Sequence, residues 1–369
     1  VGNIFGFATM VAPIYPVYLR NADKSIKIDE HGYKRFDYGD GSNAGMTRPV
    51  SGNANALQEV TLNTNNSEGN AINGTGYIEV KFLKDFVFTF NAGVGIDETR
   101  STNVLNMYYG QYATMGGLIA KSHSKGISLN LQQLLNWNRT FAGVHNVGVL
   151  LGHESYMTNS TALSASKSQM FSMENDELNG AVVDGKTAGS SRGTYNNEGY
   201  FARVQYDYLN RIFVSASYRR DASSRFHPDH RWGNFWSVGG AWLINHENFM
   251  EDVAWVDQLK LKASIGQQGN DNIGNFRYAD SYSIVNNNNE VAYQWNQKGT
   301  KDITWETNTN INAGFEFDLL KGRISGSIDY FYRLTSDMLF SLNTPPSVGY
   351  TSYFVNLGDM RNTGVELVL

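Results

Sequence analysis

The sequence contains no cysteine, and this absence rules out disulfide bonds, thiolate metal sites and cysteine catalysis. No run of about 18 apolar residues occurs, so a membrane-spanning helix is excluded. The net charge of −5 is mild, and without a basic footprint we expect no nucleic-acid partner. The first ten residues lack a basic region and a cleavage site, so they are not a signal peptide.

Glycine and aromatic residues are plentiful instead. The chain has 37 Gly against 6 Pro, and its 21 Tyr, 20 Phe and 7 Trp bring the aromatic share to 13%. Together with many Asn and Ser residues and modest charge, this composition predicts many strands joined by many turns. The length of 369 residues suffices for two average domains or for one large all-β unit.

Two-residue alternation of apolar and polar residues marks the expected strands. In "GYFARVQYDYLNRIFVSASYRRD", every second residue over 200–208 and 212–218 is apolar, on either side of a turn at Leu209-Asn210. In "INAGFEFDLLKGRISGSIDYFYR", the segments 311–319 and 324–332 alternate in the same way around a tight turn. Both patterns predict β-hairpins. The closing "GVELVL" has the same alternation.

Short and long connections follow one another along the chain. Short turns join the expected strands pairwise, at 76–83 with 86–97, 127–138 with 144–156, 200–208 with 211–220, and 304–319 with 323–335. Longer polar stretches separate these pairs, at about 98–126, 157–198, 267–303 and 337–361. Short periplasmic turns and long extracellular loops are typical of outer-membrane barrels.

We therefore predict an all-β fold, an antiparallel transmembrane β-barrel present in part. About eleven strands follow residue 75, and a twelfth is expected near 3–10. Two other classes alternate as well: a secreted or surface-exposed β-rich binding or adhesion protein without transport, and an extracellular glycosidase with two facing carboxylates. Strands of about 10–14 residues, a charged second face, and aromatic residues near strand ends favour the barrel.

Several motifs then resemble one known family. "ASYRRDASSRF" followed by "RWGNFWSVGGAWLINHENFM", then "LKLKASIGQQGNDNIGNF", "ITWETNTNINAGFEFDLLKGRISGSIDYFYRLTSDML" and "NLGDMRNTGVELVL", occur in this order. They resemble the central barrel of the SusC/RagA family of TonB-dependent outer-membrane transporters from Bacteroidetes. "APIYPVYLRNADK" is similar to a loop near the start of that region. The likeness is strongest over 199–369.

The resemblance implies a barrel of about 22 strands in the bacterial cell outer membrane, surrounded by lipid. It implies uptake of oligosaccharides or peptides and no enzymatic activity or cofactor. The partners would be a SusD-like surface lipoprotein over the extracellular loops and the TonB-ExbB-ExbD complex. Residues 1–369 would then be a part of the barrel, with the signal peptide, the plug domain and the last strands absent from this chain.

Candidate site residues come from the polar face and from one loop. We expect Arg203, Asp207, Glu316, Asp329 and Arg333 to line the substrate path, because they occupy the polar face of their strands. The list of loop candidates is Tyr282, Tyr293 and Trp295, which lie beside many Asn residues. Flat rings and amides suit sugars or extended peptides, although a solvated loop that packs on neighbouring loops or on the partner lipoprotein is the simpler interpretation.

No catalytic, cofactor or metal site is expected. The segment "FHPDHRW" offers His227, Asp229 and His230 as possible ligands of a divalent ion. A polar tight turn that begins at Pro228 is the simpler interpretation.

Overall fold

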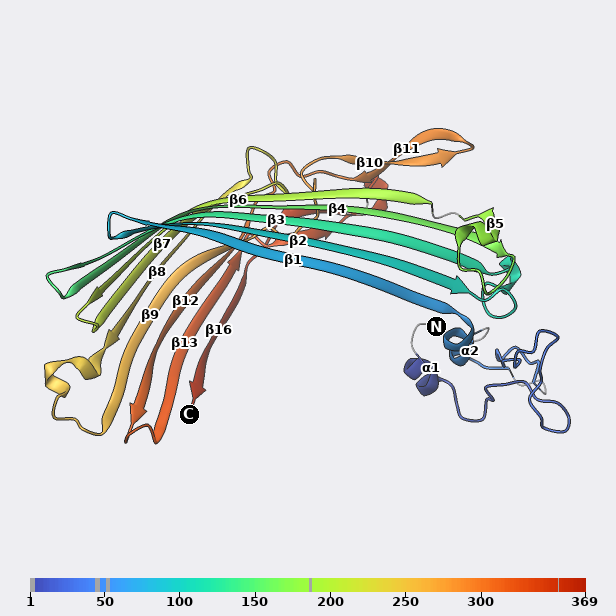
Figure 1. Ribbon diagram of the computed structural model, residues 1–369, viewed down its shortest axis with the longest axis horizontal. Helices are drawn as coiled ribbons and strands as arrows, with labels where there is room; N and C mark the ends of the chain where they lie inside the picture. The colour runs from blue at the N-terminus through green and yellow to red at the C-terminus, as the bar shows by residue number, and fades with distance from the viewer. Residues whose placement is uncertain (1–3, 44–46, 51–53, 186–187, 351) are drawn as a thin grey trace. The chain divides into compact units, whose positions relative to one another are not determined.

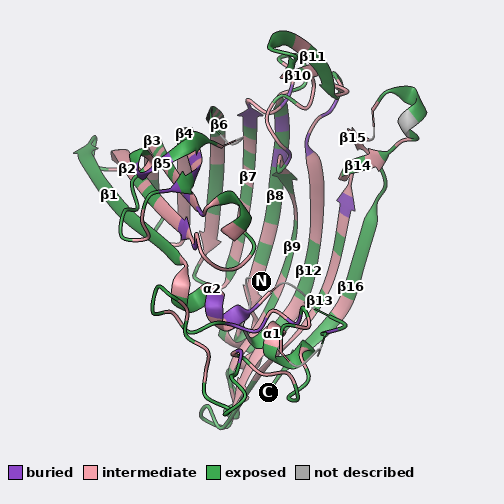
Figure 2. Ribbon diagram, turned by 90° about the vertical axis from the view of Figure 1, so that its right-hand side faces the viewer, coloured by how far each residue is buried: buried purple, intermediate pink, exposed green. Residues whose placement is uncertain are grey.

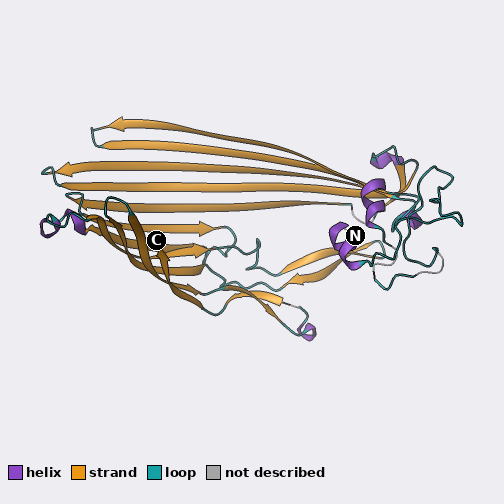
Figure 3. Ribbon diagram, turned by 90° about the horizontal axis from the view of Figure 1, so that it is seen from below, coloured by secondary structure: helices purple, strands orange, loops and turns teal. Residues whose placement is uncertain are grey.

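The computed structural model describes residues 4–43, 47–50, 54–185, 188–350 and 352–369. Most of the chain is β-structure, and the helical segments are short and lie in connections or before the first strand (Figure 3). Among the described residues, no helix combines the length and the apolar character needed to cross a membrane. The chain divides into two compact units: 1–72, 96–126 and 160–192 form the first, and 73–95, 127–159 and 193–369 form the second.

One large sheet dominates the fold (Figure 1). Its strands are β1 (Thr64–Phe82), β2 (Phe86–Leu105), β3 (Leu118–Phe141), β4 (His145–Met170), β5 (Ala181–Asp184), β6 (Gly189–Tyr208), β7 (Ile212–Ser223), β8 (Trp232–Leu243), β9 (Val256–Asn270), β12 (Glu306–Leu319), β13 (Ile324–Ser336) and β16 (Met360–Val368). Neighbours follow the order β1-β2-β3-β4-β6-β7-β8-β9-β12-β13-β16, and β5 pairs with β4. The predicted antiparallel all-β fold is confirmed.

The remaining elements lie outside this sheet. Two small hairpins are formed by β10 (Ser281–Asn287) with β11 (Glu290–Gln297) and by β14 (Leu339–Asn343) with β15 (Ser352–Asn356). The helical elements are α1 (Ile4–Met10), α2 (Ala56–Leu62) and the single 3-10 turns η1 (Ala113–Met115), η2 (Leu178–Gly180), η3 (Ile244–His246), η4 (Asn248–Met250) and η5 (Pro346–Val348).

The strand expected near 3–10 is wrong. Residues Ile4–Met10 form helix α1, and Asn3 lies outside the described residues. The following "VAPIYP" contains two prolines, which cannot donate to a strand ladder and so disfavour a regular strand that continues beyond Met10. The guanidinium of Arg48 lies over the ring of Phe7 at 5.2 Å from its centroid.

Five strands are much longer than expected. β1, β2, β3, β4 and β6 have 19, 20, 24, 26 and 20 residues, whereas about 9–11 suffice for a tilted membrane crossing. Much of the added length falls in the stretches predicted as loops, at about 98–126 and 157–198, because these carry polar residues on both faces, as in "TNSTALSASKSQ". Strand pairing uses backbone groups, so it continues where the apolar alternation has stopped.

Short turns lie side by side at one edge of the second unit. The amide of Leu209 donates to the carbonyl of Val144 at 2.9 Å, and that of Leu243 to Arg211 at 2.8 Å. At the next turn, Leu320 donates to Trp255 at 2.8 Å. These bonds join consecutive hairpins at their tight ends, so the long connections 224–231, 271–305 and 337–359 leave from the opposite strand ends.

The register places apolar residues in continuous rows across the sheet. One row pairs, strand by strand, Ile212, Trp242, Leu261, Phe315, Ile328 and Leu367. Directly opposed residues project to the same face, so this row belongs to one face of the second unit. Several of these side chains are exposed, Leu261 by 47% and Leu367 by 60%. Bands of different exposure alternate along β8, β9 and β12 (Figure 2). We call this the outer face, and the opposite face the inner face.

Two small clusters of buried apolar residues form the cores, one in each unit. In the second unit, Phe226, Phe235, Ile273, Ile303 and Trp305 form one cluster. In the first unit, Val104, Ile119, Met170 and Ala181 form another. The second-unit cluster draws on the connections 224–231 and 271–305 and on β8, so it holds these long segments together.

Candidate functional site

The inner face of the second unit carries a row of seven residues, four of which are charged. Following the register from β6 to β16, the row pairs Asp207, Phe213, Ala241, Lys262, Gly314, Asp329 and Glu366. Asp207 and Asp329, both expected on the substrate path, therefore share one face and one row. The register also adds Lys262 and Glu366, which sequence reasoning did not single out.

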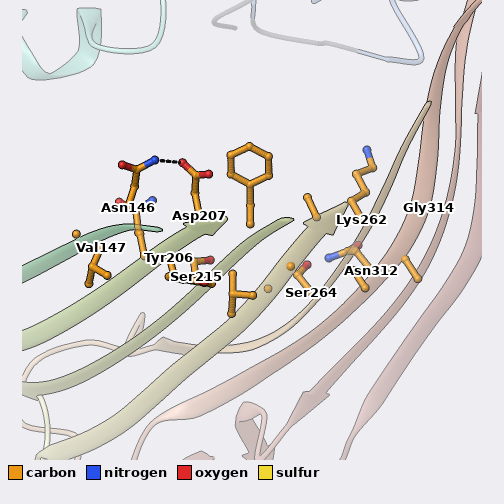
Figure 4. Close-up of a pocket in the computed structure, with 18 of the residues that line it drawn as sticks. Asn146, Val147, Tyr206, Asp207, Ser215, Lys262, Ser264, Asn312 and Gly314 are labelled. Atoms are coloured by element: carbon orange, nitrogen blue, oxygen red, sulfur yellow. Dashed lines mark hydrogen bonds between the residues drawn. The ribbon is translucent and has the colours of Figure 1, made fainter. Parts of the chain in front are cut away.

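These residues line a cavity of about 1260 Å³ in the second unit. Its lining comes from nine strands and the turn at Lys84-Asp85, and it includes Asn146, Asp207, Lys262, Asp329 and Arg333. Figure 4 shows Asn146, Asp207 and Lys262 projecting from the same side of the sheet, with a hydrogen bond between the first two. In that bond the Asn146 amide donates to the Asp207 carboxylate at 2.8 Å. The inner face is thus concave, polar and ordered by its own hydrogen bonds.

Lys262 is the centre of an ion-pair network on this face. Its Nζ lies 2.8 Å from Glu316 Oε1 and 2.9 Å from Asp329 Oδ1, and Lys260 Nζ reaches Glu316 Oε2 at 3.2 Å. Glu316 and Asp329 are therefore both held by one ammonium group. A glycosidase would need two carboxylates that flank a substrate bond, whereas these two are engaged by the same lysine.

The two expected arginines lie in a second row of the inner face. Arg203 and Arg333 are joined by a row that passes through Ser217, Ser237, Gly266 and Asn310. Both side chains are exposed, and the Arg333 guanidinium lies 5.5 Å from the centroid of the Phe331 ring. Hydroxyl and amide groups fill the row between them, which leaves both cations accessible from the concave side.

The aromatic loop candidates lie together on a hairpin. Tyr282 pairs with Trp295 and Ile284 with Tyr293 across β10 and β11, so all four project from one face. Tyr282 is 61% exposed and Tyr293 73%. Trp295 packs against Tyr350 with ring centroids 5.2 Å apart, and its Nε1 donates to the carbonyl of Gln297 at 2.8 Å. The three candidates therefore form one exposed aromatic surface, away from the charged rows.

Sequence reasoning missed a second network on the inner face. Arg219 donates from Nε to Asp221 Oδ1 at 2.7 Å and from Nη2 to Glu154 Oε2 at 3.0 Å. Gln132 donates to Glu154 at 3.1 Å, and the Arg219 guanidinium lies 5.0 Å from the centroid of the Phe201 ring. The alternation already placed Arg219 on the polar face, but no local signal identified Glu154 as its partner.

A third network joins the long connections. Asp271 Oδ2 accepts hydrogen bonds from Tyr195 at 2.8 Å and from the buried Ser223 hydroxyl at 2.6 Å. Arg225 donates to the Asp271 carbonyl at 3.0 Å and lies over the Tyr195 ring at 4.4 Å. One carboxylate thus connects the strands β6 and β7 to the connection that follows β9.

The "FHPDHRW" segment is a turn. The amide of His230 donates to the carbonyl of His227 at 2.9 Å, and His227 Nδ1 lies 3.2 Å from Asp229 Oδ2. Within the described ranges, no group of three or more His, Cys, Asp or Glu residues is arranged to hold a metal ion.

Comparison with known proteins agrees with this architecture. The family model "TonB dependent receptor-like, beta-barrel" matches residues 15–369. TonB-dependent receptor P39 of Formosa agariphila is 31% identical over 247 residues, which cover 64% of this chain and 23% of that protein. TonB-dependent receptor SusC of Bacteroides thetaiotaomicron is 28% identical over 347 residues, covering 88% of this chain and 34% of SusC.

A solved structure gives the same result. The structure of the RagAB peptide transporter matches with a TM-score of 0.79 and 25% identity over 88% of this chain and 35% of that one. The chain spans about a quarter to a third of the length of these relatives. The chain therefore belongs to the TonB-dependent receptor family of the bacterial outer membrane, as part of a β-barrel like those of SusC and RagA.

Proposed function

We propose that this chain forms part of the barrel wall of an importer that takes up oligosaccharides or peptides, as the SusC-like component of a nutrient-uptake system. The two-faced sheet carries this proposal. Its outer face is apolar and exposed, while its inner face surrounds a polar cavity of about 1260 Å³. A large hydrated solute requires such an inner face, with hydrogen-bonding groups and charges along its path.

The inner-face charges support selective passage. Lys262 is balanced by Glu316 and Asp329, whereas Arg203 and Arg333 remain exposed. Weak, distributed contacts of this kind let a substrate bind and leave again. The exposed rings of Tyr282, Tyr293 and Trp295 lie among the long connections and would make a first contact by stacking.

The partners follow from the family. We propose a SusD-like surface lipoprotein on the extracellular loops and energy supplied by the TonB-ExbB-ExbD complex. The rival function is a secreted binding or adhesion protein. Such a protein would expose the rows of apolar side chains on the outer face, from β7 to β16, to water, which opposes this exposure.

Gene deletion tests the function. A deletion strain is grown on defined oligosaccharide mixtures or on peptide mixtures as the only carbon source, and residual substrate is followed by mass spectrometry. We expect loss of growth and uptake for one substrate class, restored by the intact gene. Purified full-length protein should leave the substrate uncleaved. Unchanged growth on every mixture would overturn the proposal, and so would hydrolysis by the purified protein.

The path residues are tested in the same strain. Arg203→Ala and Arg333→Ala should each lower the uptake rate several-fold while the amount of protein in the outer membrane stays constant. Lys321→Gln serves as the matched control, since Lys321 lies in the tight turn between β12 and β13. An equal effect of all three substitutions would show that these arginines do not line the path.

A further inference from the structure

The outer face of the second unit contains a groove that import does not require. Its volume is about 660 Å³, and Phe88, Leu135, Leu151 and Tyr218 supply apolar lining from β2, β3, β4 and β7. Leu151 is 49% exposed, so the groove opens to the surroundings. In an outer-membrane protein this face contacts lipid, so a groove of this lining suits an acyl chain.

Polar groups border the groove on the side of the long connections. Tyr200 and Arg220 line it and are direct partners across β6 and β7, one step beyond the pair of Ala202 and Tyr218. The Arg220 guanidinium lies 5.0 Å from the centroid of the Trp232 ring. The Tyr218 hydroxyl donates to Asn234 at 2.8 Å. Aromatic rings beside a cation are the usual arrangement at a membrane–water interface.

Glu198, two residues from Tyr200 in β6, is already engaged. Glu198 accepts a hydrogen bond from the Tyr200 hydroxyl at 2.7 Å and lies 3.3 Å from His153 Nε2. His153 is fixed in turn by stacking on Tyr200, with ring centroids 4.7 Å apart. Arg220 is exposed and forms no ion pair within the part of the chain that the structure describes. An unpaired cation therefore stands at the polar end of the groove.

The height of Arg220 matches the lipid headgroups. Ile212 lies in the outer-face row near the tight turns. Strand β7 rises about 26 Å from Ile212 to Arg220, at about 3.3 Å per residue. With a strand tilt of about 40°, this is about 20 Å along the membrane normal, close to the roughly 25 Å apolar band of such barrels. Because the long connections of these barrels are extracellular, Arg220 lies at the level of the outer leaflet headgroups.

We propose that this groove is a binding site for a phosphorylated glycolipid of the outer leaflet, of the lipid A class. An acyl chain would lie against Leu135 and Leu151, and a phosphate would bind Arg220 by charge-assisted hydrogen bonds. Trp232 and Tyr200 would flank the sugar at the headgroup level. The proposal rests on residence in the outer membrane and does not depend on which solute is imported.

Native mass spectrometry of the full-length transporter tests the site. The detergent-purified protein is titrated with diphosphoryl lipid A and with the same lipid after removal of its phosphates. The variants are Arg220→Gln, Arg220→Lys, Ala202→Trp, which fills the groove, and Lys321→Gln as a control that removes a distant cation. Inorganic phosphate is added as a competitor in a separate arm.

The site predicts a specific pattern. Arg220→Gln should weaken binding of the phosphorylated lipid about fivefold and leave binding of the dephosphorylated form unchanged. Arg220→Lys should retain most of the affinity for the phosphorylated lipid. Ala202→Trp should weaken binding of both lipids about threefold or more. Lys321→Gln should change the binding of neither lipid. Free phosphate should not compete. Uptake of the imported solute should be normal in Arg220→Gln, which separates this proposal from the transport function.

Three outcomes would overturn the proposal. Equal retention of both lipids by every variant would identify them as non-specific annular lipid. Displacement by inorganic phosphate alone would identify a simple anion site. If Arg220→Gln weakens lipid binding and Ala202→Trp does not, the acyl groove is not part of the site.

Discussion

At the scale of single residues, this protein depends on side chains that satisfy several partners at once. Lys262 holds Glu316 and Asp329, and Asp271 accepts from Tyr195 and Ser223. Each group joins strands or connections that are distant in sequence. Removal of one such group leaves the others without partners, which costs more than the loss of a single exposed ion pair.

The Asp271 network gives the first prediction. Asp271→Ala should leave the Tyr195 and buried Ser223 hydroxyls without their acceptor and loosen the connections they hold, by about 1–3 kcal/mol. Hydrogen exchange of the segments 194–197 and 223–226 should then be faster by about one order of magnitude or more. Asp302→Ala, at an exposed position of the same long connection, is the control. Unchanged exchange in Asp271→Ala would show that these connections are held by the apolar cluster alone.

A contact in the first unit gives a pH prediction. The Tyr109 hydroxyl donates to Asp29, which also accepts from the amides of His31 at 3.0 Å and Tyr33 at 2.7 Å. Burial raises the pKa of the Asp29 carboxyl, but these hydrogen bonds outweigh it, so the net pKa lies below its usual value. Burial and the Asp29 carboxylate raise the pKa of Tyr109 to about 12.

The two shifts act at opposite ends of the pH scale. The lowered pKa of Asp29 stabilises the contact above the usual carboxyl pKa of about 3.9, and this stabilisation is lost as the pH falls through the folded value. The raised pKa of Tyr109 stabilises it below about pH 10, and this part is lost as the pH rises toward about 12. Exchange of the His31 and Tyr33 amides should therefore be slowest relative to unstructured peptide between these limits. Tyr109→Phe should abolish the alkaline loss and keep the acid one.

At the scale of elements, the tight turns use left-handed backbone at ordinary residues. Leu209 and Asn210 have φ of 52° and 53°, and Leu320 and Lys321 have φ of 57° and 62°. Two successive left-handed residues match the twist of the flanking strands, and Asn and Gly adopt this conformation most easily. Leucine adopts it at a cost of about 1–2 kcal/mol, so these turns are locally strained.

This strain gives an element-scale prediction. Leu209→Asn should stabilise the full-length barrel by about 0.5–1 kcal/mol, because Asn tolerates positive φ better than Leu. The protein is heated and then run on gels, on which the folded and unfolded forms differ in mobility. The temperature at which the mobility changes should be higher in Leu209→Asn. Phe249→Asn is the control, because it replaces an exposed apolar residue in η4 at negligible backbone cost. Leu319→Asn would not serve, because Leu319 lies in β12. Equal effects of both substitutions would show that the loss of an exposed apolar side chain, and not relief of strain in the turn, changes the stability.

At the scale of the whole molecule, the register decides what each face can contact. Adjacent residues of one strand project to opposite faces, so Ile265 belongs to the outer face with Val238 and Ile311, while Ser264 lies on the inner face with Asn312. The same alternation is repeated along the large sheet, on β6, β7, β8, β9, β12, β13 and β16. One sheet thereby meets lipid on one side and water on the other.

This arrangement predicts a large difference between two neighbouring substitutions. Ile265→Arg puts a charge on the lipid side and should destabilise the barrel by about 2–4 kcal/mol, the usual value for arginine at the membrane midplane. Ser264→Arg puts the same charge into the aqueous cavity and should be tolerated. Both are measured as folded protein in the outer-membrane fraction. Equal folding of the two variants would contradict the assignment of the faces.

The sequence by itself determined the parts that have a local cause. Alternation over two residues is a property of neighbouring positions, so the strands near 200–208, 212–218, 311–319 and 324–332 and their tight turns were predicted and confirmed. The motif order likewise identified the family. Strand ends were predicted less well, because strands continue through backbone pairing where both faces have become polar.

Only the tertiary structure decided which distant residues meet. The register placed Asp207 and Asp329 in one row, joined Lys262 to Glu316 and Asp329, and brought Phe88, Leu151 and Arg220 to one groove. It also showed that Ile4–Met10 is a helix. The physical reason is that the direction of a side chain depends on its own strand, whereas its neighbours depend on hydrogen-bond register summed over every turn and strand between them.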